Sequence, residues 1–345
     1  MSLADTRIAV VGATGVVGIE TLKLLHERGV PADAVVACAS ARRVGQSIGY
    51  GNGIATLVSI EDACAAGCGI AIFAAISDIA RQWGPRFLEA GAVVVDNSSA
   101  FRMDPSSALV VPEVNGGDAA GDLAPRIIAN PNCSTIIMLV AVNTIRTRFG
   151  CTRLDVCTYQ AASGAGLAAM EELESQTAAV LRGEAAEPRV FPEPCAFNVF
   201  SHNSAVDIDT GLNVEEQKMI DEARKIWRQP DLAVHPTCVR VPVLRTHCEA
   251  ITMELAEAAT ESQVRELLAE SPGVEVVDDR AGGVFPTSLR AANRAPVLVG
   301  RIRPDHTRPG ETTGTYRAFS MFVAGDQILK GAALNAVQIA ELVVG

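Results

Sequence analysis

A glycine-rich turn near the start of the chain constrains the fold more than any other feature. The β-prone run Ile8–Val11 leads into Gly12-Ala13-Thr14-Gly15-Val16-Val17-Gly18, and a helical pattern follows. Glycines at this spacing permit a tight turn, close packing of helix on strand, and approach of helix N-terminal amides to a pyrophosphate. The turn therefore predicts a dinucleotide-binding α/β domain. Because GxxGxxG is a variant of the usual GxGxxG, a βα turn without a ligand stays an alternative.

The first 130 residues alternate strand-like runs with helical patterns. The strand-like runs fall at 8–11, 34–39, 70–76 and 93–96, and the helical patterns at 21–26 and 86–90. Such alternation is typical of βαβ units on a parallel sheet whose two faces are covered by helices. We therefore expect an N-terminal domain with a Rossmann-type parallel sheet.

The pattern changes after Pro131. Helices are expected at 134–148, 168–181 and 214–227, and strands at 154–159, 238–243, 249–255, 297–303 and 316–323. These strands alternate or run apolar, which predicts a mixed or antiparallel sheet and hence a second, α+β domain. The boundary is placed near Asn130, because the following proline disfavours a helical residue there. From its pattern, a last apolar helix at 329–344 can pack on either domain.

Composition excludes several other classes of protein. The 345 residues suffice for about two domains, and 48% hydrophobic against 20% charged residues excludes a disordered chain. The formal net charge of −11 offers no general surface for nucleic acid or anionic membranes, and no apolar run approaches the roughly 18 residues of a membrane span. No secretory signal precedes the first strand, so a cytoplasmic protein is expected. Nine cysteines without CxxC spacing argue against disulfides and zinc, and no metal is expected.

The end of the second expected strand bears on the choice of dinucleotide. An NAD site usually carries an acidic residue there for the ribose 2′-hydroxyl. This chain has Ser40-Ala41-Arg42-Arg43 instead. Since a guanidinium suits a 2′-phosphate, the segment predicts NADP over NAD. The alternative is that both arginines are solvated loop residues.

One cysteine has a reason to be reactive. In Asn130-Pro131-Asn132-Cys133-Ser134-Thr135 a thiol stands at the start of the helix expected at 134–148. Amides at a helix N-terminus stabilise a thiolate and lower its pKa. The other eight cysteines are expected to be buried and structural. A thiolate beside a nicotinamide site predicts attack on a carbonyl, hydride transfer and a thioester intermediate.

Such chemistry needs a base, and the chain has five histidines. Four stand in structural or solvent-exposed settings: His26 in the first crossover helix, His235 before a proline, and His202 and His306 in polar loops. His247 lies between two expected strands, close in sequence to Arg240 and Arg245. A histidine in that place is a candidate general base beside an anion site.

Motifs along the whole chain point to a known family. They are GATGVVG at 12–18, NSSAFR at 97–102, VPEVN at 111–115, NPNCST at 130–135, YQAASGAG at 159–166, FPEPCAFNV at 191–199, CVRVPVLRTHCEA at 238–250 and KGAALNAVQIAE at 330–341. The sequence resembles the aspartate-β-semialdehyde dehydrogenase family nearly end to end. The related N-acetyl-glutamyl-phosphate reductases have a different sequence around their cysteine.

The resemblance implies an NADP-linked, phosphate-dependent interconversion of L-aspartyl-4-phosphate and L-aspartate-4-semialdehyde through a cysteine thioester. That step leads toward threonine, methionine and, through diaminopimelate, lysine. The resemblance also implies a homodimer joined by the second domain. Residues 1–130 with the C-terminal helix 328–345 are then expected to form the NADP-binding domain, and residues 131–327 the catalytic and dimerisation domain.

The resemblance further assigns roles to residues. Cys133 is implied as the nucleophile, His247 as the acid/base, and Gln160 as the residue that orients the intermediate. Substrate contacts are implied for Arg240 with the α-carboxylate, Glu215 with the amine, Arg102 and Lys218 with the phosphate, and Asn132 with the oxyanion. Without the resemblance, Glu215 and Lys218 fit a surface i,i+3 ion pair, and Arg102 fits a loop charge.

Cofactor contacts are implied for two groups: Gly12, Thr14, Gly15, Val16, Val17, Gly18, Ser40, Arg42 and Arg43, and then Ser163, Gly164 and Gln327. Several positions depart from the family pattern. Gln327 replaces an asparagine near the cofactor amide, Leu329 an arginine, Phe200-Ser201 an Ile-Pro pair, and Cys248 and Arg43 each a serine. These changes leave Cys133, Gln160, Arg240 and His247 in place.

Two other functions are compatible with the sequence. The first is an NADP-dependent acyl-phosphate reductase for a different dicarboxylate semialdehyde. The second is a non-catalytic paralogue that keeps the fold for binding or assembly. Retention of Cys133, Gln160, Arg240 and His247 weighs against the second, because such a paralogue would be free to lose its nucleophile.

Overall fold

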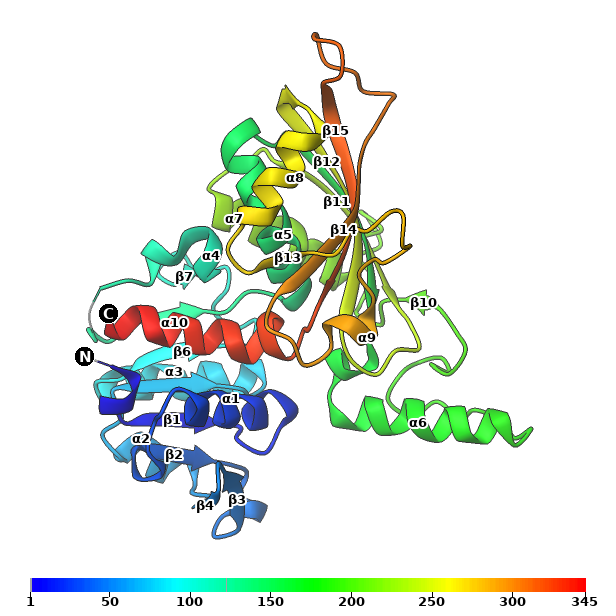
Figure 1. Ribbon diagram of the computed structural model, residues 1–345. Helices are drawn as coiled ribbons and strands as arrows, with labels where there is room; N and C mark the ends of the chain where they lie inside the picture. The colour runs from blue at the N-terminus through cyan, green and yellow to red at the C-terminus, as the bar shows by residue number, and fades with distance from the viewer. Residues whose placement is uncertain (1, 122) are drawn as a thin grey trace. The chain divides into compact units, whose positions relative to one another are not determined.

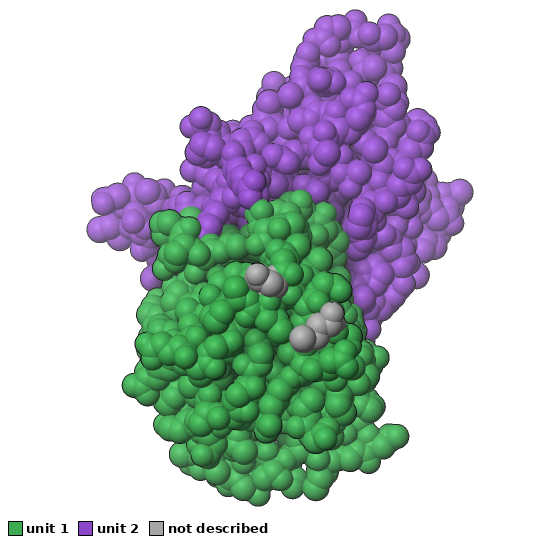
Figure 2. Space-filling view, turned by 90° about the vertical axis from the view of Figure 1, so that its left-hand side faces the viewer, with its two compact units in different colours: residues 1–132, 331–345 green, residues 133–330 purple. Residues whose placement is uncertain are grey.

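The computed structural model describes residues 2–121 and 123–345. The chain divides into two compact units, which Figure 2 shows in different colours. Unit 1 comprises residues 1–132 and 331–345, and unit 2 comprises residues 133–330. No helix in the described ranges is long and apolar enough to cross a membrane.

Unit 1 is built on a six-stranded sheet in which every neighbouring pair is parallel. The strand order is β2-β1-β5-β6-β8-β7, with β1 Ile8–Val11, β2 Val35–Cys38, β5 Ile70–Phe73, β6 Val93–Asp96, β7 Ala108–Leu109 and β8 Ile127–Ala129. Every residue of β1, β2, β5 and β6 is buried, as expected of parallel strands covered on both faces. A separate hairpin joins β3 Ser47–Tyr50 to β4 Gly53–Thr56.

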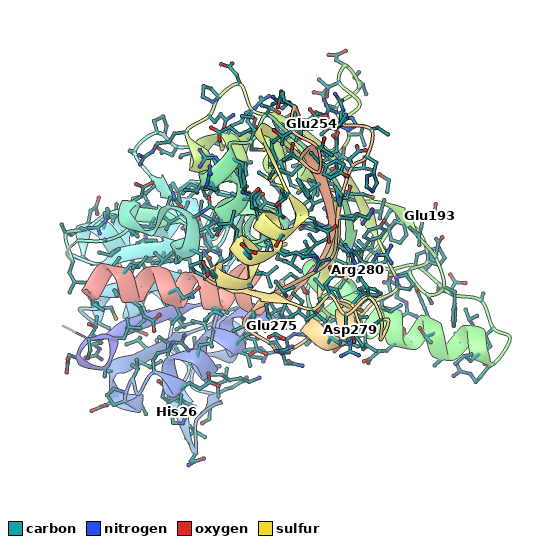
Figure 3. The ribbon with its side chains drawn as sticks, turned by 45° about the horizontal axis from the view of Figure 1, so that its top comes forward. His26, Glu193, Glu254, Glu275, Asp279 and Arg280 are labelled. Carbon is teal, nitrogen blue, oxygen red and sulfur yellow. The ribbon has the colours of Figure 1, made fainter. Side chains whose placement is uncertain are left out.

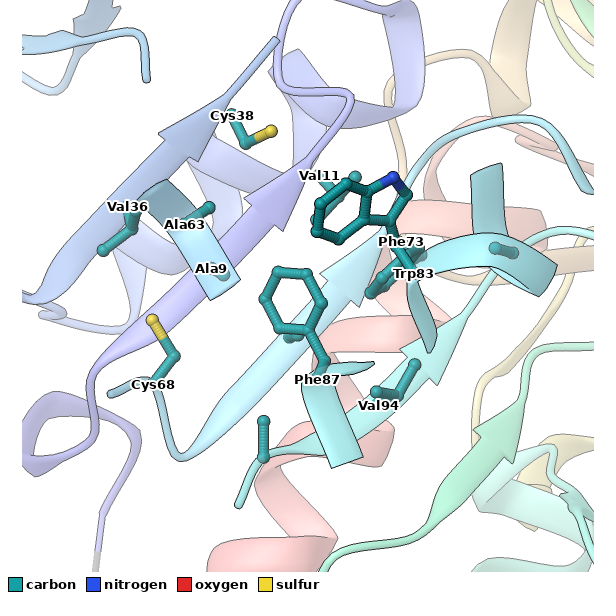
Figure 4. Close-up of a cluster of buried hydrophobic side chains, with 13 residues drawn as sticks. Ala9, Val11, Val36, Cys38, Ala63, Cys68, Phe73, Trp83, Phe87 and Val94 are labelled. Carbon is teal, nitrogen blue, oxygen red and sulfur yellow. The ribbon is translucent and has the colours of Figure 1, made fainter. Parts of the chain in front are cut away.

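Helices cover both faces of this sheet (Figure 1). They are α1 Val16–Glu27, α2 Ile60–Ala65, α3 Ser77–Glu89, α4 Pro112–Asn115 and α10 Leu334–Val344, with 3-10 turns η1 Leu3–Asp5, η2 Ala32–Ala34, η3 Ala41–Arg43 and η4 Gly116–Asp118. On one face Ala63 of α2 and Trp83 and Phe87 of α3 pack against β1, β2, β5 and β6 (Figure 4). The C-terminal helix α10 contacts α1, α4, β5 and β6. The C-terminus thus returns to the parallel-sheet unit.

Unit 2 contains a seven-stranded mixed sheet of order β10-β11-β9-β12-β15-β14-β13. Its strands are β9 Arg153–Gln160, β10 Phe200–Ser201, β11 Ala233–Arg240, β12 His247–Ala259, β13 Val274–Val276, β14 Val297–Pro304 and β15 Tyr316–Gly325. The pairs β9–β11 and β13–β14 are parallel, and the other neighbours are antiparallel.

The helices of unit 2 are α5 Cys133–Phe149, α6 Leu167–Leu181, α7 Val214–Trp227, α8 Glu261–Glu270 and α9 Ser288–Ala291, with a 3-10 turn η5 Ala162–Ala165 and a π-helical turn η6 Leu329–Ala333. Helices α5, α7 and α8 pack against the sheet through β12, β11 and β14 (Figure 1). The predicted fold class is therefore confirmed: a Rossmann-type parallel sheet, a second mixed-sheet unit, and a returning C-terminal helix.

One predicted strand was displaced. The strand expected at 238–243 is β11, which begins at Ala233 and ends at Arg240. Pro236 lies inside this strand, although proline lacks the amide that a central strand needs. However, β10 pairs only with Val239 and Arg240, so Pro236 lies on an edge and is tolerated. The expected C-terminal helix likewise divides into the π-turn η6 and α10.

A carboxyl group lies in the core of unit 2. Glu249 of β12 pairs in register with Thr158 of β9 and Val323 of β15, and its side chain is fully buried. Neither carboxyl oxygen has a hydrogen-bond partner among the described residues. Burial raises the pKa of Glu249 well above its usual value and so favours the neutral form of the carboxyl group.

Replacing Glu249 with glutamine is expected to remove a pH-dependent loss of stability. The unfolded carboxyl ionises at about pH 4.3, whereas the folded one does not, so stability falls as the pH rises toward the folded pKa, by about 1.4 kcal/mol per pH unit. Thermal unfolding between about pH 5 and 8 measures this: the Tm of Glu249→Gln minus that of wild type should grow with pH. A constant difference would contradict it. The control is Glu257→Gln, whose side chain is 72% exposed beside Arg148.

Candidate active site

The turn after β1 brings backbone segments of unit 1 unusually close together. Gly12 has a φ of +87°, a conformation that favours glycine. A Cβ at Gly12 would lie 2.4 Å from the carbonyl oxygen of Ala74, and one at Gly18 would lie 2.2 Å from the carbonyl oxygen of Gly12. Both positions therefore require glycine. Helix α1 begins at Val16, and the first amides of a helix have no partner within it, which suits an anion.

A cavity of about 480 Å³ adjoins this turn. Its lining includes Gly12, Thr14 and Gly15 of the turn and Ser40 and Ala41 after β2. The volume falls within the roughly 300–1,000 Å³ typical of ligand pockets. Arg42 and Arg43 follow in the turn η3, and both side chains are exposed. The glycine turn and the end of the second strand, predicted separately, thus meet at one cavity.

Arg102 holds a fixed place in unit 1. Its Nε donates to the carbonyl oxygen of Asn130 and its Nη2 to that of Asn97, both at 2.9 Å. The residue is only 8% exposed. A guanidinium bound twice to the main chain is preorganised for an anion, and the alternative of a solvated loop charge does not describe it.

In unit 2 the predicted nucleophile is the first residue of α5. The helix runs Cys133–Phe149, one residue earlier than expected. Cys133 is partly exposed, while six cysteines are buried: Cys38, Cys68, Cys151, Cys195, Cys238 and Cys248. Burial raises the pKa of Cys38, Cys151 and Cys248 to about 12 and that of Cys68 to about 11. These thiols stay protonated and unreactive at neutral pH.

Two cysteines differ from the expectation of burial. Cys64 and Cys157 are partly exposed. Cys64 lies on the short surface helix α2, and Cys157 lies on the less buried side of β9, whose residues alternate between partly and fully buried. Neither stands at the start of a helix, so Cys133 keeps its special position.

Gln160, the last residue of β9, joins two helices. Its Nε2 donates to Ser134 Oγ of α5 at 2.7 Å and to Glu215 Oε1 of α7 at 3.1 Å. The side chain is 1% exposed, and its Oε1 has no hydrogen-bond partner among the described residues. A buried acceptor therefore stands beside the residue that follows Cys133.

Glu215 and Lys218 are more than a surface ion pair. Asn213 caps α7 by accepting from the amide of Glu216 at 2.9 Å. This places Glu215 in the first turn, with a side chain 8% exposed. One carboxylate oxygen accepts from Gln160, and the other lies 3.3 Å from Lys218 Nζ. A buried carboxylate with an ammonium beside it can bind a charged ligand from the start of α7.

Arg240, the last residue of β11, is a buried cation. It is 3% exposed, and its Nη1 donates to the carbonyl oxygen of Ala161 at 2.9 Å. The guanidinium lies 5.3 Å from the ring centroid of Phe191. Burial lowers its pKa, and the charges of Glu215 and Cys133 oppose that shift. Arg240 Nε is buried and has no hydrogen-bond partner among the described residues.

His247 is held in one tautomer by the same backbone segment. The amide of Ala161 donates to His247 Nδ1 at 3.1 Å, so a neutral ring carries its proton on Nε2. Burial, with a smaller contribution from the charge of Arg240, lowers the pKa of His247 to about 3. At neutral pH the ring is therefore an uncharged hydrogen-bond donor.

Gly164 explains how these two side chains fit together. A Cβ at this position would lie 3.1 Å from His247 Cε1, 3.2 Å from His247 Nε2 and 3.2 Å from Arg240 Nη1. Glycine thus leaves the space in which the imidazole and the guanidinium sit. Its predicted contact with the cofactor stays a prediction.

Both polar atoms of the Gln327 side-chain amide form hydrogen bonds within unit 2. Its Oε1 accepts from the amide of Thr246 at 2.8 Å, and its Nε2 donates to Ser163 Oγ. Thr246 has a φ of +85°, a strained conformation for a β-branched residue, and it directly precedes His247. The predicted cofactor contacts of Ser163 and Gln327 stay predictions; in the structure these side chains brace the turn before His247.

One histidine, His202, lies in a different setting from the one predicted. His202 was expected to be solvent-exposed in a polar loop, but it is partly buried, with Nε2 2.8 Å from Arg240 Nη2. The loop folds back along β11, where Phe200 pairs with Arg240. No local sequence pattern marks this contact, because it joins residues 38 positions apart. His26, labelled in Figure 3, packs in unit 1 against Tyr50, with ring centroids 5.5 Å apart.

Comparisons with known proteins define the class. The model of the semialdehyde dehydrogenase NAD binding domain matches residues 7–121, and that of the semialdehyde dehydrogenase dimerisation domain matches residues 142–330. The two matches together cover most of the chain, so the class is that of semialdehyde dehydrogenases.

Similarity to individual proteins identifies the family within this class. The chain is 44% identical to aspartate-semialdehyde dehydrogenase of Aquifex aeolicus, with 98% of each chain covered, and 41% identical to that of Synechocystis sp., with 98% of this chain and 97% of the relative covered. The crystal structure of Vibrio cholerae aspartate semialdehyde dehydrogenase II complexed with ASA superimposes with a TM-score of 0.91 at 40% identity, covering 98% of this chain and 97% of that one. The chain belongs to the aspartate-semialdehyde dehydrogenase family, and it is an oxidoreductase of amino-acid biosynthesis.

Adding a methyl group at Gly164 is expected to impair catalysis. In Gly164→Ala the imidazole of His247 or the guanidinium of Arg240 must move by a few tenths of an ångström, and we expect kcat/KM for the semialdehyde to fall about tenfold. Steady-state kinetics measure this. The control is Gly49→Ala, where a Cβ meets nothing within 4 Å. Unchanged kinetics in Gly164→Ala would show that the two side chains are not confined there.

Proposed function

We propose that this protein is an NADP-linked aspartate-β-semialdehyde dehydrogenase that converts L-aspartyl-4-phosphate into L-aspartate-4-semialdehyde and phosphate, and the reverse. The observation that carries the proposal is the position of Cys133 at the start of α5. Gln160 binds both the following residue, Ser134, and Glu215. The charge of Cys133 also acts on Arg240. The product serves the synthesis of threonine, methionine and, through diaminopimelate, lysine.

The glycine turn, the adjoining cavity and the end of β2 suit an NADP molecule. Gly12, Thr14, Gly15 and the start of α1, with Val16, Val17 and Gly18, would hold the pyrophosphate. Ser40, Arg42 and Arg43 would hold the 2′-phosphate. The segment after β2 has no carboxylate for a ribose hydroxyl, which supports NADP over NAD.

The charges of the candidate site match those of the substrate. Arg240 would bind the α-carboxylate through its guanidinium, and Glu215 would bind the α-amine. Lys218 and Arg102 would bind phosphate. Because the substrate carries a carboxylate, an ammonium and a phosphate, recognition needs these four charges and favours an amino-dicarboxylate over a simple aldehyde.

The chemistry would be carried by the Cys133 thiolate. Its sulfur attacks the C4 carbonyl of aspartyl phosphate; the C–S bond forms, the C–O bond to phosphate breaks, and phosphate leaves with the electron pair. Bound NADPH supplies the hydride that reduces the resulting thioester. The C–S bond then breaks as the carbonyl of the aldehyde re-forms, and the thiolate is restored.

His247 would act at Nε2, where its proton is held because Nδ1 accepts from Ala161. That N–H donates to the substrate oxygen as negative charge develops on it and passes the proton as acid/base. Gln160 would orient the acyl group, and the side chain of Asn132 would add a second donor to the oxyanion. The low pKa of His247 keeps the ring uncharged before substrate binds.

We further propose a cytoplasmic homodimer joined through unit 2. The match of residues 142–330 to a dimerisation domain supports this arrangement. Exposed large apolar side chains of unit 2, among them Phe197, Val199 and Ile208, are available for a protein contact.

Changing Cys133 to alanine is expected to abolish turnover while NADP still binds. The measurement is a phosphate-dependent assay with L-aspartate-4-semialdehyde, beside a fluorescence titration with NADPH, which should give the wild-type Kd. Cys64→Ala, at the other partly exposed thiol on a helix, should keep full activity. Turnover by Cys133→Ala would refute the nucleophile. Faster wild-type turnover of another dicarboxylate semialdehyde would reassign the substrate.

Changing Arg42 to alanine is expected to raise the KM for NADP about tenfold or more and to leave the KM for NAD almost unchanged, because one charge-assisted contact to the 2′-phosphate is lost. Lys23→Ala controls for the general loss of positive charge, since Lys23 lies on α1 and is 60% exposed. A wild-type preference for NAD, or equal effects on both cofactors, would contradict the assignment.

A further inference from the structure

The segment 200–204 supplies contacts to Arg240 that the family motifs did not assign. Arg240 Nη2 donates to Asn203 Oδ1 at 3.1 Å, and it lies 2.8 Å from His202 Nε2. Both residues stand in the segment where the sequence departs from the family's Ile-Pro. Two of the guanidinium's partners thus come from a loop that folds back along β11 through the short strand β10.

The contact with arginine determines where His202 carries its proton. A guanidinium can only donate, so His202 Nε2 must be the acceptor and the proton must be on Nδ1. Nδ1 lies 3.1 Å from Ser204 Oγ, which can accept it. The amide of Ser204 also approaches Nδ1, at 3.2 Å, and alone would favour the other tautomer. The shorter contact with a permanent cation outweighs it, because charge-assisted hydrogen bonds are about twice as strong as neutral ones.

From Ser204 the hydrogen bonds continue into α7. Ser204 Oγ donates to Asn213 Oδ1 at 3.4 Å and accepts from the amide of Glu215 at 3.2 Å. Asn213 is the N-cap of α7, and Glu215 is the residue proposed to bind the substrate amine. One directed chain therefore runs from Arg240 through His202 and Ser204 to the first turn of α7.

The charges around His202 agree with this neutral tautomer. Burial, together with the charges of Arg240 and Lys218 and against that of Glu215, lowers the pKa of His202 to about 4. A protonated ring would place a second cation against Arg240. The imidazole is thus an uncharged acceptor throughout the neutral pH range.

We propose that His202 is a positioning residue that sets the distance between the carboxylate clamp Arg240 and the amine-binding Glu215. The proposal rests on the proposed function, because it takes these two residues as the sites for the α-carboxylate and the α-amine. His202 touches no reacting atom. It therefore acts on substrate affinity and on discrimination among amino-dicarboxylates.

The test compares His202→Leu with His202→Gln. Leucine removes the acceptor, and we expect the KM for L-aspartate-4-semialdehyde to rise about tenfold, with kcat changed less than about threefold and the KM values for phosphate and NADP unchanged. Glutamine can offer Oε1 in place of Nε2, so His202→Gln should recover most of the affinity. The control His235→Leu removes an exposed histidine from the same strand as Arg240 and should match wild type.

A second measurement does not depend on activity. Nitrogen-15 NMR of histidine-labelled protein, with His202 assigned by the Gln variant, should show Nδ1 protonated and Nε2 unprotonated at neutral pH. A protonated Nε2 would overturn the proposal even if His202→Leu fails to fold.

The kinetic results distinguish failure of the positioning role of His202 from failure of the proposed dehydrogenase function. A wild-type protein that does not oxidise L-aspartate-4-semialdehyde overturns the proposed function, while the tautomer can still be read. An active wild type whose KM is unaffected by His202→Leu overturns the positioning role. If kcat falls in both His202→Leu and His202→Gln in parallel with a fall in Tm, His202 has only a structural role. That result also overturns the positioning role.

Discussion

The buried guanidinium of Arg240 is the constraint on which the rest of unit 2's candidate site depends. Arginine keeps its charge in proteins, so a side chain that is 3% exposed must be compensated by its surroundings. The Ala161 carbonyl, Asn203, His202 and the face of Phe191 supply that compensation. These groups come from three segments, since His202 and Asn203 share one loop, so one charge fixes the mutual placement of β11, the turn after β9 and the loop before α7.

The same charge organises the electrostatics of the neighbouring groups. It contributes to the low pKa of His247 and of His202, and both rings are therefore neutral where a second cation would repel Arg240. Glu215 provides the opposite sign and is itself held by Gln160 and Lys218. The site thus combines a cation, two neutral imidazole rings and an anion. This arrangement suits a substrate that carries both a positive and a negative charge.

Many features of the fold and of the candidate site were predictable from local sequence. The glycine turn, the strand periodicity and the position of Cys133 before an apolar helix depend on neighbouring residues, and these parts agreed with the structure. His247 was selected as a candidate because it lies close in sequence to Arg240 and Arg245. His202 was missed because its contact spans 38 residues of chain and exists only after the loop folds back. The buried Glu249 and the edge position of Pro236 likewise follow from strand order, which no local pattern contains.

The main-chain contacts of Ala161 affect how the candidate site tolerates amino-acid substitutions. Its N–H binds His247 and its carbonyl oxygen binds Arg240, so one residue's main chain sets the spacing between proton donor and cation. Every residue except proline has both main-chain groups, so a substitution at 161 other than proline keeps the N–H and the carbonyl oxygen. The spacing between His247 and Arg240 therefore depends on the main chain of residue 161 rather than on its side chain, and proline is the one replacement that removes a partner.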